Sequence, residues 1–114
     1  MDRLEQRVAN LEQSFHTAIV ATQPISIWLS SLGVVGYTVQ KPIPVTIRQD
    51  GDEFVATFFD ANISTGGDTE QEAIANLQSL IADFYDDLAA TPDEKLGPSL
   101  RRQKLVLVEF LCRT

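Results

Sequence analysis

The first apolar pattern in the chain repeats at helical spacing. Between residues 2 and 22, apolar side chains recur at alternating steps of four and three, which forms one stripe along a helix. The stripe consists of Leu4, Val8, Leu11, Phe15 and Ala18. Pro24 ends or restarts the helix, because proline lacks the backbone N–H that a helix interior needs. The pattern predicts an amphipathic helix, and both docking on its own domain and pairing with a second copy of the chain fit it.

The next apolar segment, residues 25–39, is compatible with two structures. Alternate positions from Ile25 are apolar, as in a strand, whereas Trp28 and Leu32 ahead of Gly33 suit helical turns that end at a glycine. We predict a short helix followed by an extended piece. We expect Trp28 to fill the core rather than to stack on a ligand.

Alternation at period two then predicts a β-hairpin. Apolar and polar residues alternate in 43–50, Asp50-Gly51 supplies a turn, and the β-branched and aromatic segment 53–59 returns. Because Pro44 cannot donate a ladder hydrogen bond, we place the first strand at a sheet edge. A turn at 60–62 leads to a short third strand at 63–65.

The most regular helical pattern follows two glycines. Apolar residues at steps of three and four predict a long amphipathic helix: Ala73, Ile74, Leu77, Leu80, Ile81, Phe84, Tyr85 and Leu88. The segment Thr69-Glu70-Gln71-Glu72 matches a capping box, and Asp68 is an alternative cap.

The glycine pair Gly66-Gly67 raises the question of a phosphate-binding loop. No lysine follows it, and the carboxylates of Asp68, Glu70 and Glu72 would repel a phosphate. The same acids stabilise a helix N-terminus that binds no ligand. We therefore predict a turn and a capped helix start.

The last segment also fits two structures. Residues 105–108 resemble a strand, but Leu105, Val108 and Leu111 are helical neighbours after a Gly97-Pro98 helix start, so we predict a helix. The whole chain is then an α+β protein in which an antiparallel hairpin and a short third strand pack on a long amphipathic helix, with extra helices at the N- and C-terminal ends. We divide it into an N-terminal extension, 1–40, and a β-β-β-α domain with a helical tail, 41–114.

Charge and residue types narrow the classes of function. The net charge of −7 argues against direct nucleic-acid binding, which needs a basic face. The single cysteine, Cys112, allows neither an internal disulfide nor a cysteine-based zinc site, and His16 is the only histidine that could activate a nucleophile. The N-terminus lacks the apolar core of a signal peptide, and 25–39 is too short and interrupted to span a membrane. We expect a cytoplasmic protein without a catalytic site, a cofactor or a metal.

Acidic residues on the long helix are the candidate partner-binding site. Asp83, Asp86 and Asp87 lie on one flank of the helix, and the last two are near its C-terminus, where the helix dipole disfavours negative charge. A solvated face explains them most simply, and an electrostatic surface for a basic protein is the alternative. The candidate oligomer contact consists of Leu4, Val8, Leu11, Phe15 and Trp28.

Three short motifs within residues 43–90 carry a family resemblance. They are Pro44-Val45-Thr46-Ile47, Asp52-Glu53-Phe54-Val55-Ala56, and Gly67-Asp68-Thr69 with Gln71-Glu72-Ala73. In these motifs the chain resembles the HicB-like antitoxin family. The resemblance covers less than half of the chain. The resemblance implies a β-β-β-α domain similar to part of an RNase H-like fold, homodimers or larger assemblies, and neutralisation of a small basic RNA-cleaving toxin without catalysis.

The chain also departs from the family pattern. The usual Pro-Asp-Leu-Pro-Gly-Cys is replaced by residues 59–64, and residues 97–114 are too short for the DNA-binding tail of many members. Residues 1–40 lie outside the pattern. Two functions follow as hypotheses: an antitoxin whose acidic helix meets a basic toxin, or a solitary self-associating structural or regulatory domain, with a homodimer expected in either case.

Overall fold

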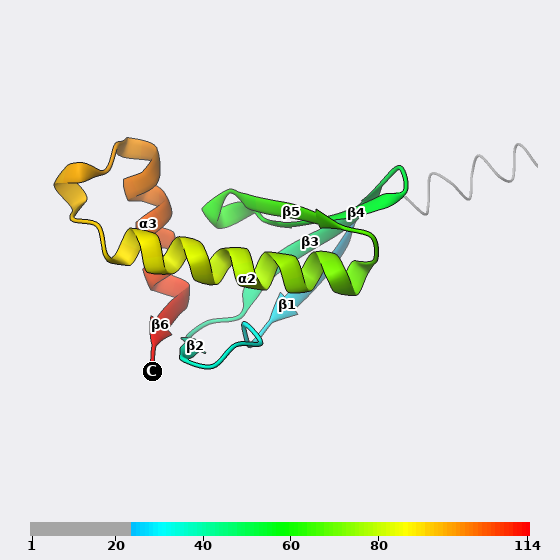
Figure 1. Cartoon of the computed structure of the whole chain (residues 1–114), viewed down its shortest axis with the longest axis horizontal. Coiled ribbons are helices and arrows are strands. Elements are labelled where there is room, and N and C mark those ends of the chain that lie inside the picture. Colours follow the sequence, from blue (N-terminus) through cyan, green and yellow to red (C-terminus); the bar gives the residue numbers. More distant parts are fainter. Residues whose placement is uncertain (1–23) are drawn as a thin grey trace, which may run out of the picture.

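The computed structural model of the chain describes residues 24–114, so the predicted helix at 2–22 and its stripe lie outside the described residues. The described part is an α+β arrangement of strands and helices (Figure 1). In chain order its elements are β1 (Ile25–Leu29), β2 (Tyr37–Val39), β3 (Ile43–Asp50), β4 (Glu53–Phe58), the 3-10 turn η1 (Phe59–Ala61), β5 (Ile63–Gly67), α2 (Glu70–Ala89), the 3-10 turn η2 (Asp93–Lys95), α3 (Pro98–Phe110) and β6 (Leu111–Arg113).

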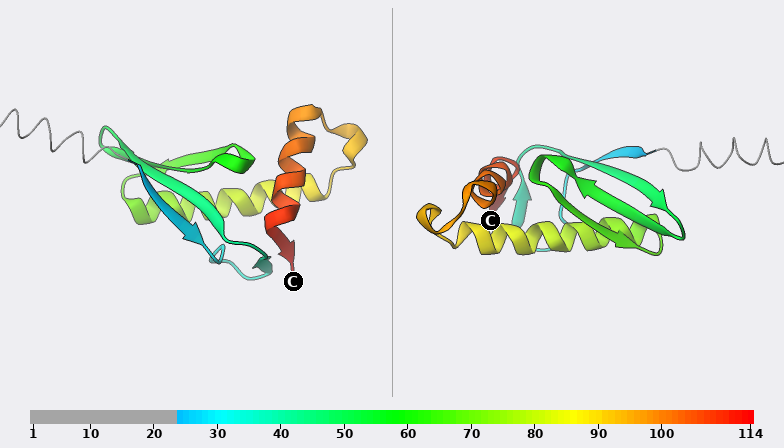
Figure 2. Two further views of the ribbon diagram at one scale, coloured as in Figure 1. Left: turned by 180° about the vertical axis from the view of Figure 1, so that it is seen from behind. Right: turned by 90° about the horizontal axis from the view of Figure 1, so that it is seen from above.

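The main sheet is antiparallel and has the strand order β1-β3-β4-β5. Side chains alternate across its plane, and α2 lies along one face (Figure 2). The face toward α2 carries the buried residues of the sheet: Leu29, Ile43, Val45, Ile47, Ala56, Phe58 and Ile63. Each large apolar side chain buried there contributes roughly 1.5–3 kcal/mol, so the contact between sheet and helix is the main source of stability.

The predicted hairpin, third strand and long helix are confirmed. The hairpin turn is one residue later than expected, because Asp50 pairs with Glu53 and leaves Gly51 and Asp52 as the two-residue loop. Gly51 has a φ of 66°, the positive value that a II′ turn requires at its first central position.

The prediction of a short helix early in residues 25–39 is wrong. Ile25–Leu29 forms β1, which pairs with β3 along five residues, so a partner distant in sequence decides between two locally possible structures. Trp28 is also not a core residue, since 69% of it is exposed. The prediction that the strand at 43–50 lies at a sheet edge is also wrong, because β3 pairs with β1 on one side and with β4 on the other. Pro44 is tolerated in β3 because the pairing with β4 begins only at Thr46.

The C-terminal helix is confirmed as α3, which begins after Gly97 with Pro98 in its first turn. The chain then continues as β6, which pairs with β2 in a second, two-stranded sheet. Leu107, Phe110 and Leu111 are buried in the same apolar core as the main sheet and α2. The small sheet and α3 therefore close one end of the main core.

Candidate protein-binding surfaces

The start of α2 is fixed by its first turn. The hydroxyl of Thr69 accepts a 3.0 Å hydrogen bond from the backbone N–H of Glu72, so Thr69 rather than Asp68 is the cap. The carboxylate of Glu72 accepts a 2.6 Å bond from the N–H of Asp68, one residue before the cap position that a capping box uses. The glycine-rich stretch thus serves to start the helix.

The exposed side of α2 carries acidic residues toward both of its ends. Residues spaced by three and four form one line along it, which we call the acidic stripe: Glu72, Asn76, Ser79, Asp83 and Asp87. The helix has 20 residues and hence a length of about 30 Å, and its sequence contains no lysine or arginine. Asp83, Asp86 and Asp87 are all exposed, so the fold brings the three predicted residues to one side of α2.

Asp86 is occupied within the chain. Its carboxylate accepts a 2.6 Å hydrogen bond from the hydroxyl of Tyr37 and forms a 2.9 Å ion pair with Arg113. The Arg113 guanidinium also lies 4.8 Å from the centre of the Tyr37 ring. The cation from β6 offsets the unfavourable position of Asp86 near the helix C-terminus. Among the ion pairs of residues 24–114, none involves Asp83 or Asp87.

The contact with Asp86 and Arg113 changes the pKa of Tyr37. Its hydrogen bond to Asp86 raises the pKa of Tyr37 above the ordinary value of 10.0, because ionisation would break that bond and place a phenolate beside a carboxylate. Arg113 acts in the opposite direction and lowers the pKa. The phenol therefore remains a neutral donor that holds β2 to α2.

A second acidic surface lies at the end of the sheet where the β3–β4 hairpin and the start of α2 meet. This surface was not predicted from the sequence. Asp50 pairs with Glu53 in the hairpin, and a depression of about 370 Å³ is lined by Glu53, Asp68 and Glu72 together with Gly66, Gly67 and Asn76. The β4–β5 register pairs Phe54 with Gly67 and so brings the acids of the two turns together, which no local sequence pattern indicates.

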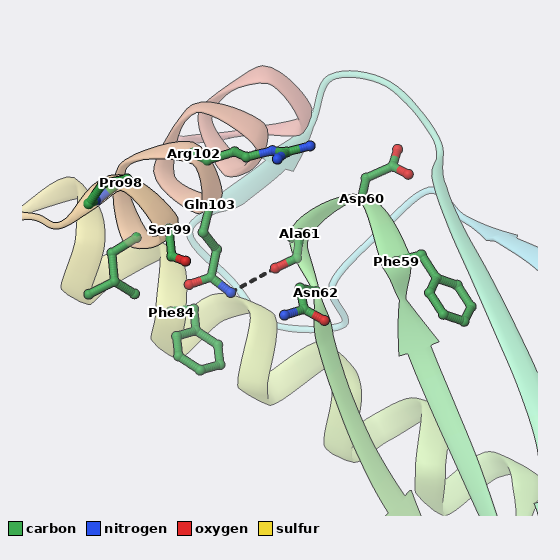
Figure 3. Close-up of a pocket in the computed structure, with 10 residues that line it drawn as sticks. Phe59, Asp60, Ala61, Asn62, Phe84, Pro98, Ser99, Arg102 and Gln103 are labelled. Carbon is green, nitrogen blue, oxygen red and sulfur yellow. Dashed lines mark hydrogen bonds between the residues drawn. The ribbon is translucent and has the colours of Figure 1, made fainter.

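A groove lies between η1, α2 and the start of α3 (Figure 3). It has a volume of about 780 Å³, and Gln103 donates a 2.7 Å hydrogen bond across it to the carbonyl of Ala61. Its lining contains Phe59, Phe84 and Leu100 and two charged residues, Asp60 and Arg102. Its lining contains neither histidine nor cysteine.

Of the five residues of the predicted oligomer contact, the structure describes only Trp28. Leu4, Val8, Leu11 and Phe15 lie outside the described residues, whereas Trp28 projects from the main sheet on the face opposite α2. Within residues 24–114, no three histidine, cysteine or acidic side chains come together as metal ligands. None of the helices in that part combines the length and apolarity that crossing a membrane requires.

Comparison with known proteins adds no relative. No protein-family model matches the chain, and no curated protein sequence or solved structure matches it either. The resemblance to HicB-like antitoxins therefore rests on the motifs in residues 43–90.

Proposed function

We propose that this chain is a non-catalytic binding protein of the HicB-like antitoxin type, which neutralises a small basic RNA-cleaving protein. One observation carries the proposal: α2, which is about 30 Å long, contains no lysine or arginine and exposes Glu72 at its start and Asp83, Asp86 and Asp87 near its end. The sheet-and-helix arrangement and the motifs of residues 43–90 support it. The contact is with protein rather than nucleic acid, since phosphates would be repelled by the same surface.

The contact is assigned to Asp83 and Asp87. Both side chains are exposed, and neither forms an ion pair within residues 24–114, so each is able to meet a lysine or arginine of a partner. Asp86 already pairs with Arg113 and supports the fold instead. Complementary charges of this kind accelerate association and select against acidic partners.

The test pairs the chain with any small basic protein that a neighbouring reading frame encodes. Co-expression should restore the growth of cells that produce that protein, and the two chains should copurify. The double variant Asp83→Asn and Asp87→Asn should weaken the complex by roughly tenfold and reduce its salt dependence, because it removes two charges from the contact.

A matched control distinguishes the effect of the Asp83 and Asp87 positions from the effect of the change in net charge. The double variant Asp52→Asn and Glu94→Gln makes the same charge change away from the acidic stripe and should bind as the wild type does. Equal weakening by both pairs would show that only total charge matters. A wild-type chain that neither binds the neighbour nor restores growth would contradict the antitoxin role and favour a solitary self-associating domain.

A further inference from the structure

The two outer strands of the main sheet, β1 and β5, differ in how their unpaired edges are protected. Within residues 24–114 each of them pairs with another strand on one side only (Figures 1 and 2). At β5, the side-chain amide of Asn76 donates a 2.9 Å hydrogen bond to the carbonyl of Gly66, and Asp60 and Asp68 flank the strand within three positions. Charged residues and groups that cover the backbone keep an edge from pairing with a further strand.

The β1 edge has neither protection in the part of the chain that the structure describes. No side-chain hydrogen bond there involves a residue of β1. The sequence contains no Asp, Glu, Lys or Arg between Glu12 and Lys41, so β1 and its flanks are uncharged. Ile25 is 51% exposed and Trp28 is 69% exposed. An uncharged edge strand with exposed apolar side chains is a surface on which another strand pairs.

The hairpin register shows which backbone groups of β1 face outward. The turn of a two-residue hairpin loop is closed by a hydrogen bond between its first and fourth residues, so Asp50 of β3 points its backbone groups at β4. Because the direction alternates along an antiparallel strand, Val45 points its N–H and C=O at Ile27 of β1. The neighbours of Ile27 in β1, Ser26 and Trp28, therefore direct their N–H and C=O groups away from the sheet.

Two copies of β1 are complementary to each other about Ile27. In an antiparallel pair centred there, Ser26 of each copy stands opposite Trp28 of the other, and these are the residues whose backbone groups face outward. Each of these two pairs exchanges two hydrogen bonds. The same register places Ile25 opposite Leu29 of the second copy, on the side of the sheet that α2 covers. It also brings the two Trp28 residues to diagonal positions about 7–8 Å apart on the outer face, within reach of aromatic side chains.

The charge of the chain is located away from this edge. The loop after β1 contacts α2 through Gln78, whose amide donates a 3.0 Å hydrogen bond to the carbonyl of Ser31. Asp83 and Asp87 lie five and nine positions further along α2, which is about 140° and 180° around the helix from Gln78. The net charge of −7 therefore does not bring like charges together at a β1 contact, and exposed charges further apart are screened within about 8 Å in physiological salt.

We propose that two copies of the chain pair along the free edges of β1, antiparallel and centred on Ile27, so that their main sheets become one. A second copy fits this edge because the outward backbone groups, the apolar side chains and the absence of charge all match under a two-fold rotation. Both α2 helices then lie on the same face of the joined sheet. The pairing is independent of the antitoxin role, since it leaves Asp83 and Asp87 exposed for another partner.

The first test compares matched proline substitutions on the two outer strands, with the mass of the full chain followed by light scattering over a range of concentrations. The wild type should have the mass of two chains. Ser26→Pro removes an outward N–H from β1 and leaves the pairing with β3 in place. It should raise the dissociation constant by roughly tenfold or more, because each dimer loses two hydrogen bonds.

Ser64→Pro is the matched control, because Ser64 of β5 also directs its backbone groups outward by the same alternation. It should leave the mass unchanged. A wild type with the mass of one chain would overturn the proposal. Loss of the dimer in both proline variants, or in neither, would also overturn it.

A pair of cysteine variants tests the register without relying on how the proline variants fold. In chains that also carry Cys112→Ser, Ile27→Cys should form a disulfide between two copies on mild oxidation. Residue 27 stands opposite itself, and the Cα atoms of such a non-hydrogen-bonded pair lie about 4.5 Å apart, within the range of a disulfide. Ile25→Cys, on the same face, should not, because its counterpart lies about 14 Å away along the strand. Cross-linking by neither variant, or equally by both, would overturn the proposal.

Discussion

Gly67 lies where β5 approaches the first turn of α2 so closely that there is no room for a side chain. A Cβ at this position would lie 2.4 Å from the backbone nitrogen of Ala73 and 2.8 Å from the carbonyl carbon of Glu72. These are backbone atoms of the first turn of α2, so they cannot move without disturbing the helix. The last residue of β5 is therefore glycine because the strand and the helix approach closely.

Gly67→Ala should destabilise the protein by about 1–3 kcal/mol, the usual cost of forcing extra volume into a packed site. Gly66→Ala is the control, since its Cβ would meet mainly the flexible end of Glu53 at 3.3 Å. Urea denaturation of both variants measures the difference. Equal midpoints for the two variants would show that β5 and α2 separate easily at this point.

The cap at Thr69 gives a second prediction at this scale. Thr69→Ala should lower the free energy of unfolding by about 1 kcal/mol, because the N–H of Glu72 loses its acceptor. Thr69→Ser retains the hydroxyl and should recover most of this loss in the same denaturation experiment. Partner binding should be unchanged in both variants, and a loss of binding without a loss of stability would instead give the loop itself a direct role.

At the scale of elements, β2, β6 and α2 are joined by the contact of Tyr37, Asp86 and Arg113. All three polar groups are exposed, so the contact adds little to stability in water. Its effect is on protonation. The folded chain holds the Tyr37 proton more tightly than the unfolded chain does, so this contribution is present below the ordinary pKa and is lost as the pH rises through the raised one.

Substitutions at the two charged partners should move the pKa of Tyr37 in opposite directions. Asp86→Asn should lower it toward the ordinary value of 10.0, and Arg113→Gln should raise it further, since the carboxylate raises this pKa and the guanidinium lowers it. Titration of tyrosinate absorbance measures both shifts. Tyr37→Phe identifies which of the two tyrosines is observed, and shifts in the same direction would contradict the arrangement.

How far each element could be predicted depends on where its deciding contact lies. The periodicity from Ala73 to Leu88 predicted α2, because the residues that form the apolar face of a helix lie three and four positions apart in its own sequence. Ile25–Leu29 allowed both a strand and a helix, and only pairing with β3 decides. The three residues of β6 likewise depend on Tyr37–Val39, more than 70 positions earlier in the chain. Local patterns cannot carry such information.

The candidate site divides in the same way. Asp83, Asp86 and Asp87 were predicted to share a flank, because residues three and four apart are neighbours on a helix. That Asp86 is paired could not be predicted, since its partner Arg113 approaches only through the β2–β6 sheet. The acidic surface around Glu53 and Asp68 was missed because it needs the register of β4 and β5.

At the scale of the whole molecule, one apolar core connects both sheets and both described helices. Leu111, the first residue of β6, is 1% exposed and belongs to the same buried cluster as Ile43 and Leu77. Phe110 beside it packs edge-on against Phe58 of the main sheet at 5.1 Å between ring centres. The C-terminal segment is thus part of the domain, and we expect it to unfold with the sheet in one transition.

Leu111→Ala tests this coupling. It should lower the free energy of unfolding by about 2–5 kcal/mol, because it removes a large side chain from the core and leaves a cavity. Leu105→Ala, at a position 64% exposed on α3, should change it by less than about 0.5 kcal/mol. Hydrogen exchange followed by mass spectrometry should show Leu111→Ala weakening protection in β3 and α2 as well as in β6. Loss of protection confined to β2 and β6 would show that the small sheet opens independently, and the core would then be two cooperative units rather than one.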